Sequence, residues 1–123
     1  MAQARPQITE LIRRYVIMLE TRGVPVERAI VFGSHASGAP RPDSDIDVAV
    51  ISPRFETMSL LERYEALGLA NRDLQAPLDV VGFSPTQIAQ CEPESFLAEI
   101  LKTGLDVLVH ASKRDYLPTH STL

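Results

Sequence analysis

The sequence predicts an α/β domain, and three observations support this fold class. Apolar residues recur at helical spacing in two long segments, residues 8–19 and 59–73. Three short runs, at residues 28–32, 45–51 and 78–81, have the apolar, β-branched composition of buried strands. The helical and extended patterns alternate along the chain and do not separate into two halves, which is typical of a sheet packed against helices.

Taken in order, the first element is an amphipathic helix. Its predicted buried residues recur every three or four positions: Ile8, Leu11, Ile12, Tyr15, Val16 and Leu19. Gly23 suits the position just after a helix, and Pro25 prevents continuation. A short strand over residues 28–32 is expected next, and residues 34–37 are expected to form a short helix that Gly38 ends.

The second predicted strand covers residues 45–51. Both of its faces become apolar after Asp47, so it is expected to lie in the centre of the sheet. Ser59 and Glu62 match a capping box, which predicts the start of a long helix that ends near Asp73. The predicted buried stripe of this helix is Leu60, Leu61, Tyr64, Leu67 and Leu74.

The last third of the chain is expected to contribute a strand, two helices and a final strand. The strand covers residues 78–81, a short helix starts at Pro85, and the second helix runs from Pro93 to about Lys102. The final strand covers residues 105–109. The predicted inward-facing residues of the second helix are Phe96, Leu97, Ile100 and Leu101.

Length and composition narrow the class of protein. The 123 residues, with 45% hydrophobic content, are expected to form one domain over residues 1–110, followed by a polar tail over 111–123 whose disorder stays an open alternative. The single cysteine, Cys91, cannot form an internal disulfide, which fits a reducing cytoplasm. No apolar run is long enough for a membrane span, and a net charge of −4 argues against strong nucleic-acid binding.

Chemistry is predicted where the first strand ends and the second begins. Asp45 and Asp47 are two residues apart at a strand entry, so both carboxylates are expected to project from the same face. Two adjacent like charges are costly without a cation, and carboxylate oxygens select Mg²⁺ or Mn²⁺ over zinc. Gly33 allows close backbone approach, and Ser34 adds a hydroxyl near a helix start, features that suit phosphate oxygens. Together these residues indicate a nucleotide site.

Each of these signals has a structural alternative. An Asp at a strand entry is often turn chemistry, and Gly-Ser occurs in many loops. Asp79 is more informative, because an acid is unfavourable inside the apolar segment Leu78-Asp79-Val80-Val81 unless the strand is an exposed edge. The combination of all three signals favours function over the alternatives.

Gly33-Ser34, a ten-residue spacer, Asp45-x-Asp47 and the later Asp79 resemble the motif of the DNA polymerase beta-like nucleotidyltransferase superfamily. The short chain is most similar to its minimal nucleotidyltransferases, the MNT-domain proteins. The resemblance is close over residues 28–82 and implies the nucleotidyltransferase fold, with a mixed sheet of about four strands and helices packed against it.

The resemblance also implies a mechanism: a nucleoside monophosphate, AMP from ATP, moves to a hydroxyl while pyrophosphate leaves. Asp45, Asp47 and Asp79 would hold two Mg²⁺ ions, with Mn²⁺ as an alternative, and Asp79 would also take the proton of the acceptor. Gly33 and Ser34 would hold the β- and γ-phosphates.

Many MNT proteins pair with a HEPN-domain toxin, so a HEPN toxin is the acceptor that the resemblance implies. Two alternatives stay open: a non-catalytic antitoxin that acts by occlusion, and a subunit of an antibiotic nucleotidyltransferase. The sequence also leaves open a homo- or hetero-oligomer, and whether Arg41 or His35 contacts the nucleotide.

Overall fold

Four strands and their connecting helices follow one another in the predicted order in a computed structural model, which describes residues 5–37 and 45–107. The elements are α1 (Pro6–Thr21), β1 (Arg28–Phe32), α2 (Ser34–Ser37), β2 (Ile46–Ile51), the 3₁₀ turn η1 (Pro53–Thr57), α3 (Leu60–Leu74), β3 (Leu78–Phe83), α4 (Pro85–Ala89), α5 (Phe96–Thr103) and β4 (Leu105–Asp106). None of the helices in these two ranges combines the length and hydrophobicity that a membrane span requires.

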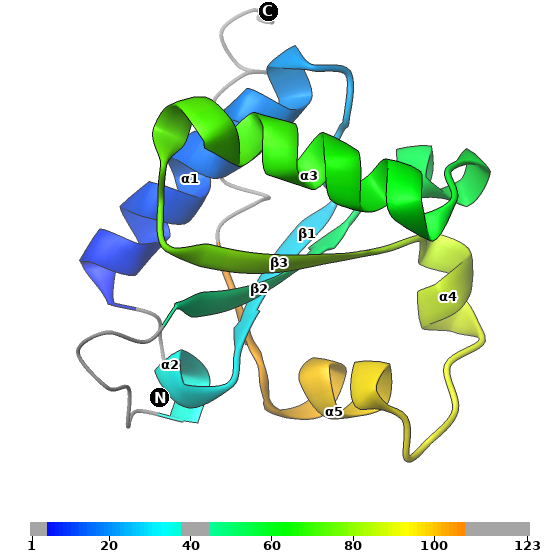
Figure 1. Cartoon of the computed structure of the whole chain (residues 1–123). Coiled ribbons are helices and arrows are strands. Elements are labelled where there is room, and N and C mark those ends of the chain that lie inside the picture. Colours follow the sequence, from blue (N-terminus) through cyan, green and yellow to red (C-terminus); the bar gives the residue numbers. More distant parts are fainter. Residues whose placement is uncertain (1–4, 38–44, 108–123) are drawn as a thin grey trace, which may run out of the picture.

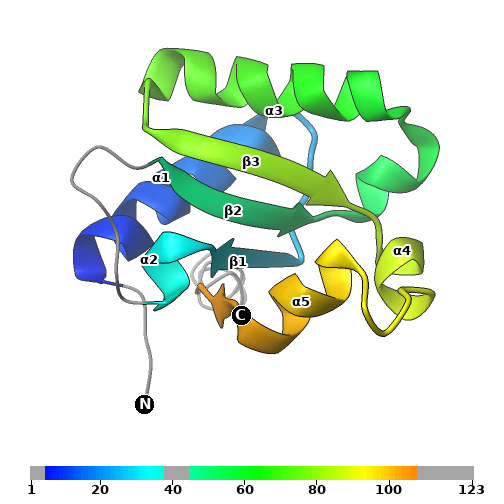
Figure 2. The same ribbon diagram turned by 60° about the horizontal axis from the view of Figure 1, so that its bottom comes forward.

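The strands form one mixed sheet in the order β3-β2-β1-β4. β1 is antiparallel to both β2 and β4, whereas β2 and β3 are parallel. Helices α1 and α3 cover one face of this sheet and α5 lies against the other, so three layers result (Figure 1, Figure 2). β2 is central and residues 48–51 are buried, as the apolar pattern of both its faces predicted.

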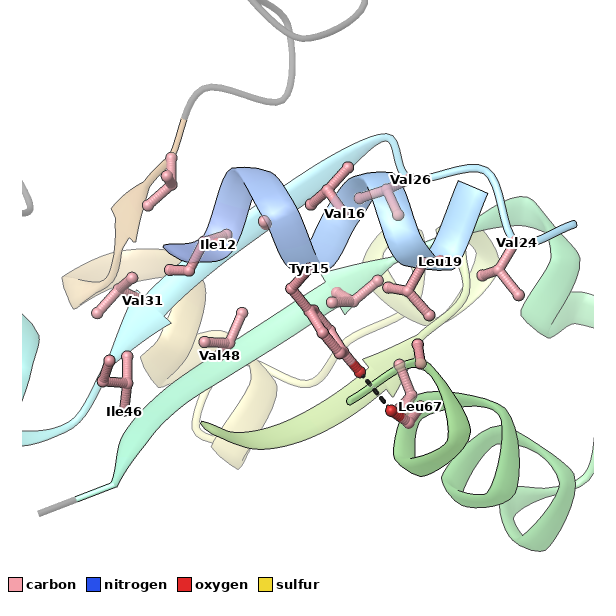
Figure 3. Packing of buried hydrophobic residues seen from close by; sticks show 14 of the residues in the cluster. Ile12, Tyr15, Val16, Leu19, Val24, Val26, Val31, Ile46, Val48 and Leu67 are labelled. Carbon is pink, nitrogen blue, oxygen red and sulfur yellow. Dashed lines mark hydrogen bonds between the residues drawn. The ribbon is translucent and has the colours of Figure 1, made fainter. Parts of the chain in front are cut away.

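The larger core lies between the sheet and the pair of helices α1 and α3. Ile12, Tyr15 and Leu19 of α1 pack against Val31 and Val48 of the strands (Figure 3). The predicted apolar face of the first helix is thereby confirmed, and Gly23 follows α1 with a φ of +87°, the left-handed conformation expected at a helix end.

Tyr15 brings a polar group into this core. Its side chain is fully buried, and the hydroxyl donates a 2.7 Å hydrogen bond to the backbone carbonyl of Leu67 in α3 (Figure 3). Burial raises the pKa of the Tyr15 phenol, so the group stays neutral and remains a donor at physiological pH. The bond links α1 to α3 across 52 positions of sequence.

Replacement of Tyr15 by phenylalanine is expected to lower the free energy of unfolding by about 0.5–1.5 kcal/mol, the usual net value of one hydrogen bond. Urea unfolding followed by circular dichroism measures this change. Tyr64→Phe is the matched control, because Tyr64 lies on α3 with an exposed side chain, and its free energy of unfolding should not change. Equal losses in the two variants would contradict the role of the buried hydroxyl.

The buried stripe predicted for the helix after Ser59 is partly wrong. Leu67 is buried and Leu74 packs against the core, but Leu60, Leu61 and Tyr64 are 63%, 67% and 54% exposed. The capping box itself is present, with Ser59 accepting from the backbone of Glu62 and the Glu62 side chain accepting from the backbone of Ser59.

Arg63 provides the physical reason for this difference. Its guanidinium donates to the backbone carbonyls of Phe55 and Gly82, at 2.8 and 3.3 Å, and to the side-chain oxygen of Gln87 at 2.7 Å. It also lies 5.6 Å from the ring centroid of Phe55. The N-terminal part of α3 therefore directs Arg63 toward η1 and β3, and Leu60 and Leu61 remain at the surface.

The C-terminal elements also differ in detail from the prediction. The helix predicted from Pro93 begins at Phe96, because the Ser95 side chain caps it by accepting from the backbone of Ala98. Phe96 was predicted to face inward, but it is the first residue of α5 and is 59% exposed. Val107 still donates to the Ala29 carbonyl after β4. The rest of the final strand predicted to residue 109, and the tail at 111–123, lie outside the described residues.

A smaller core occupies the opposite face of the sheet, beneath α5. It contains Ile30 of β1, Ala49 of β2 and Ile100 of α5. Phe32 and Val81 pack against this cluster. The face of the sheet that α5 covers is therefore apolar in its middle, and Phe32 extends this apolar surface to the end of β1.

Candidate active site

The end of β1 requires glycine. Gly33 has a φ of +72°, in the left-handed region that residues other than glycine rarely adopt. A Cβ atom at this position would collide with Oδ2 of Asp47. The backbone turn after Phe32 thus passes directly against the Asp47 carboxylate. The predicted approach of this turn to phosphate oxygens stays a prediction.

The sheet register sets Asp47 beside Asp79. Phe32 of β1 is the direct partner of Asp47 in β2, and Asp47 is the direct partner of Asp79 in β3. Direct partners project from the same face, so these three side chains form one line across the sheet, which we call the cross-strand row. The next line toward the sheet interior, formed by Ile30, Ala49 and Val81, belongs to the smaller core.

The electrostatics of the row centre on Asp47. Burial, followed by the negative charge of Asp79, raises the pKa of the Asp47 carboxyl above its usual value. His35 lowers this pKa and Asp45 raises it further. Asp47 therefore experiences more negative than positive charge, a condition that a bound cation would relieve.

Asp45 is exposed and lies just before β2, which begins at Ile46 and not at the predicted residue 45. Within residues 5–37 and 45–107, no group of three His, Cys, Asp or Glu side chains lies close enough together to hold a metal ion. The register does make Asp47 and Asp79 neighbours, and their oxygen donors suit Mg²⁺ or Mn²⁺. The chemistry of this carboxylate pair therefore fits such an ion.

Ser34 and His35 lie in α2, directly after the glycine turn. The amides of Ala36 and Ser37 both donate to the carbonyl of Gly33, which starts this short helix. Ser34 is partly buried, and the charge of His35 acts on Asp47. The predicted loop of residues 39–43, with Arg41, lies outside the described residues.

The position of Asp79 agrees in part with the non-functional explanation of this residue, an exposed place on an edge strand. β3 is the edge strand of the sheet and Asp79 is exposed, as the alternative explanation of an edge position requires. An edge position alone does not account for the pairing with Asp47, which places two carboxylates side by side at an unfavourable electrostatic cost. The residue is accessible and also belongs to the cross-strand row.

Two aromatic side chains at the β1 end of the cross-strand row were not predicted as part of the site. The rings of Phe32 and Phe96 meet at nearly right angles, with centroids 5.6 Å apart and an interplanar angle of 80°. The sequence predicts Phe32 only as part of a buried strand and Phe96 only as an inward-facing residue of a helix. The available signal was the position of Phe32 directly before Gly33, which fixes it at the same end of β1 as the glycine turn.

This fold and site define an α/β domain with acidic side chains at one end of a mixed sheet, next to a glycine turn. Residues 12–107 match the family model described as nucleotidyltransferase domain, and the chain belongs to this family. A search of curated proteins gave no match.

Solved structures share the fold. A crystal structure of a putative nucleotidyltransferase from Sulfolobus solfataricus is 19% identical, with a TM-score of 0.56, over 68% of this chain and 73% of the other. A toxin–antitoxin crystal structure with AMP-PNP is 20% identical, with a TM-score of 0.52, over 89% of this chain and 84% of the other. A mutant of the MntA–HpeT toxin–antitoxin is 18% identical, with a TM-score of 0.50 and the same two coverages. These similarities confirm the predicted fold class.

Proposed function

We propose that this nucleotidyltransferase domain transfers AMP from ATP to a hydroxyl group of a partner protein. The observation that carries the proposal is the register that makes Asp47 a neighbour of Asp79, with the Gly33 turn against the Asp47 carboxylate. Membership of the nucleotidyltransferase family supports a nucleotide substrate. The similar toxin–antitoxin structure holds the ATP analogue AMP-PNP, which supports ATP as the nucleotide.

In this proposal the carboxylates and the glycine turn have two different roles. Asp45, Asp47 and Asp79 would hold two Mg²⁺ ions, or Mn²⁺, which when bound neutralise the charge that develops on the transferring phosphoryl group. Gly33 and Ser34 would hold the β- and γ-phosphates with the backbone of the turn and the serine hydroxyl.

The bond changes are those of an in-line displacement. The acceptor oxygen forms a bond to the α-phosphorus while the bond to the bridging oxygen breaks, and pyrophosphate leaves. Asp79 would accept the proton of the acceptor hydroxyl, because its exposed position on the edge strand leaves room for an incoming group. Asp47, in the middle of the row, would lie nearest the α-phosphate.

The proposed partner is a HEPN-domain toxin. The similar structures that contain toxin–antitoxin pairs support a toxin as the partner, and the HEPN domain is what the resemblance to the MNT-domain proteins implies. Residues 5–37 and 45–107 form one sheet with its helices, and this part of the chain contains no second domain to hold an acceptor. The surface that presents the hydroxyl would therefore come from the partner.

Incubation with Mg²⁺, α-labelled ATP and the product of the adjacent gene tests the proposal. Label is expected on the partner protein with the native chain, and it should be absent with Asp45→Asn/Asp47→Asn. Transfer of label from γ-labelled ATP would instead reveal kinase chemistry and would refute the mechanism. Lack of transfer in a complex that still forms would refute catalysis and favour binding alone.

A non-catalytic antitoxin that acts by occlusion is the second candidate. The observation that favours it is the apolar surface of α3, where Leu60, Leu61 and Tyr64 are all more than half exposed. Occlusion predicts that Asp79→Asn still neutralises the toxin. Transfer predicts that the same variant binds the toxin and fails to neutralise it, so one substitution separates the two candidates.

A further inference from the structure

Phe96 is a large aromatic side chain exposed beside the cross-strand row. Its exposed fraction is 59%, although Ile100, one helical turn later, is buried. The ring contacts Phe32 edge to face, and Phe32 is the β1 member of the row. Phe96 is therefore held at the β1 end of the candidate site while much of its surface is open to solvent (Figure 2 shows α5 below β1 and β2).

We propose that Phe96 forms the contact surface for the nucleobase of the bound nucleotide. The inference rests on the proposed function and names the part of the substrate that this side chain recognises. Phe32 supports the ring from one side through the edge-to-face contact, which limits its motion before a ligand arrives. Phe96 is thus a substrate-binding residue with no part in the bond changes.

The order of strands favours the nucleotide over the acceptor as the ligand of Phe96. Asp79 lies on the edge strand β3, whereas Phe32 lies on β1, with β2 and Asp47 between them. Gly33, the proposed phosphate contact, follows Phe32 directly in the chain. A group that reaches Phe96 therefore belongs to the same molecule as the phosphates at Gly33, while the acceptor enters at the Asp79 end.

The charges near Phe96 favour an uncharged planar group. Glu94 and Glu99 lie two and three residues from Phe96 in sequence, and Glu99 is in the first turn of α5. Carboxylates at this position repel phosphate, so the polyphosphate chain is not expected here. A base presents a neutral π-face to an aromatic ring, and such stacking tolerates different bases.

Titration calorimetry on the full-length chain with Mg²⁺-ATP and with Mg²⁺-tripolyphosphate, which has no base, tests the inference. Phe96→Ala is expected to raise the Kd for ATP by roughly 5- to 100-fold, the usual effect of losing one base–aromatic contact, and to leave the Kd for tripolyphosphate unchanged. Phe96→Tyr should bind ATP as the native chain does. Leu69→Ala is the control, because it removes an exposed apolar side chain from α3 and should change neither Kd.

Three results would overturn the inference. An unchanged ATP affinity in Phe96→Ala would show that the ring does not contact the base. Equal weakening of ATP and tripolyphosphate would show that Phe96 acts on the shape of the phosphate site. Absence of ATP binding by the native chain would overturn the proposed function as well, which distinguishes the two failures. If Phe96→Ala does not fold, Phe96→Leu provides the same test, because it keeps the apolar contact with Phe32 and removes the aromatic face.

Discussion

Replacement of Asp47 by asparagine is expected to lower the rate of nucleotidyl transfer by roughly 10³-fold, equivalent to several kcal/mol of lost charge stabilisation in the transition state. Asparagine preserves the volume of the side chain and removes its negative charge. Asp47 is the middle member of the cross-strand row, with Asp79 as its direct partner and Asp45 two residues earlier. Loss of its charge would weaken the binding of both proposed cations.

The same substitution is expected to leave the melting temperature unchanged or higher in metal-free buffer. Burial and the charge of Asp79 raise the pKa of the Asp47 carboxyl, so its ionised form is less favourable in the folded protein than in the unfolded chain. The neutral amide removes this unfavourable interaction. Transfer of label from α-labelled ATP and thermal unfolding measure the two effects.

Asp73→Asn is the matched control for this prediction. It makes the same chemical change at an exposed residue of α3, where Asp73 forms a long 3.8 Å ion pair with Arg22. Native rates are expected from this variant. A native rate from Asp47→Asn, or an equal loss from both variants, would refute the role of the row in catalysis.

Replacement of Gly33 by alanine is expected to lower transfer by about 100-fold, because a displacement of about 1 Å at a reacting group has an effect of this size. The new Cβ atom would collide with the Asp47 carboxylate and displace it. The left-handed backbone would also cost about 1–2 kcal/mol of stability.

Gly23→Ala separates these two effects. Gly23 has a similar φ of +87°, but a Cβ atom there would meet nothing within 4 Å. Both variants are therefore expected to lose similar stability in urea unfolding, and only Gly33→Ala should lose transfer activity. If activity falls equally in both variants, general destabilisation explains the loss and the close approach to Asp47 does not.

Much of this arrangement could be predicted from local sequence. The strands before Gly33 and after Asp45 end and begin where turn residues and charges interrupt apolar runs, and the capping box at Ser59 marks the start of α3. These signals depend on neighbours a few residues apart, so a single sequence contains them. The pairing of Asp47 with Asp79 was implied by the family motif, and the parallel register of β2 and β3 agrees with it.

The features that could not be predicted depend on contacts between distant segments. No neighbouring residue in the sequence indicates that the Arg63 guanidinium donates to carbonyls of η1 and β3, the arrangement in which Leu60 and Leu61 remain exposed. The sequence predicts that Phe96 faces the core, because it belongs to the same apolar helical pattern as Leu97 and Ile100. Only the position of α5 over β1 shows that this ring contacts Phe32 and remains open to a ligand.

The edge position of β3 has a consequence for how the proposed enzyme chooses its targets. Asp79 stands at the open margin of the sheet, so a hydroxyl group can reach it without entering an enclosed chamber. The site then does not select acceptors by size, because a tyrosine on a large folded protein can reach Asp79 as readily as a small alcohol can. Selectivity in such an enzyme has to arise from affinity between two protein surfaces, and a poor match would simply shorten the time that a wrong target spends beside Asp79.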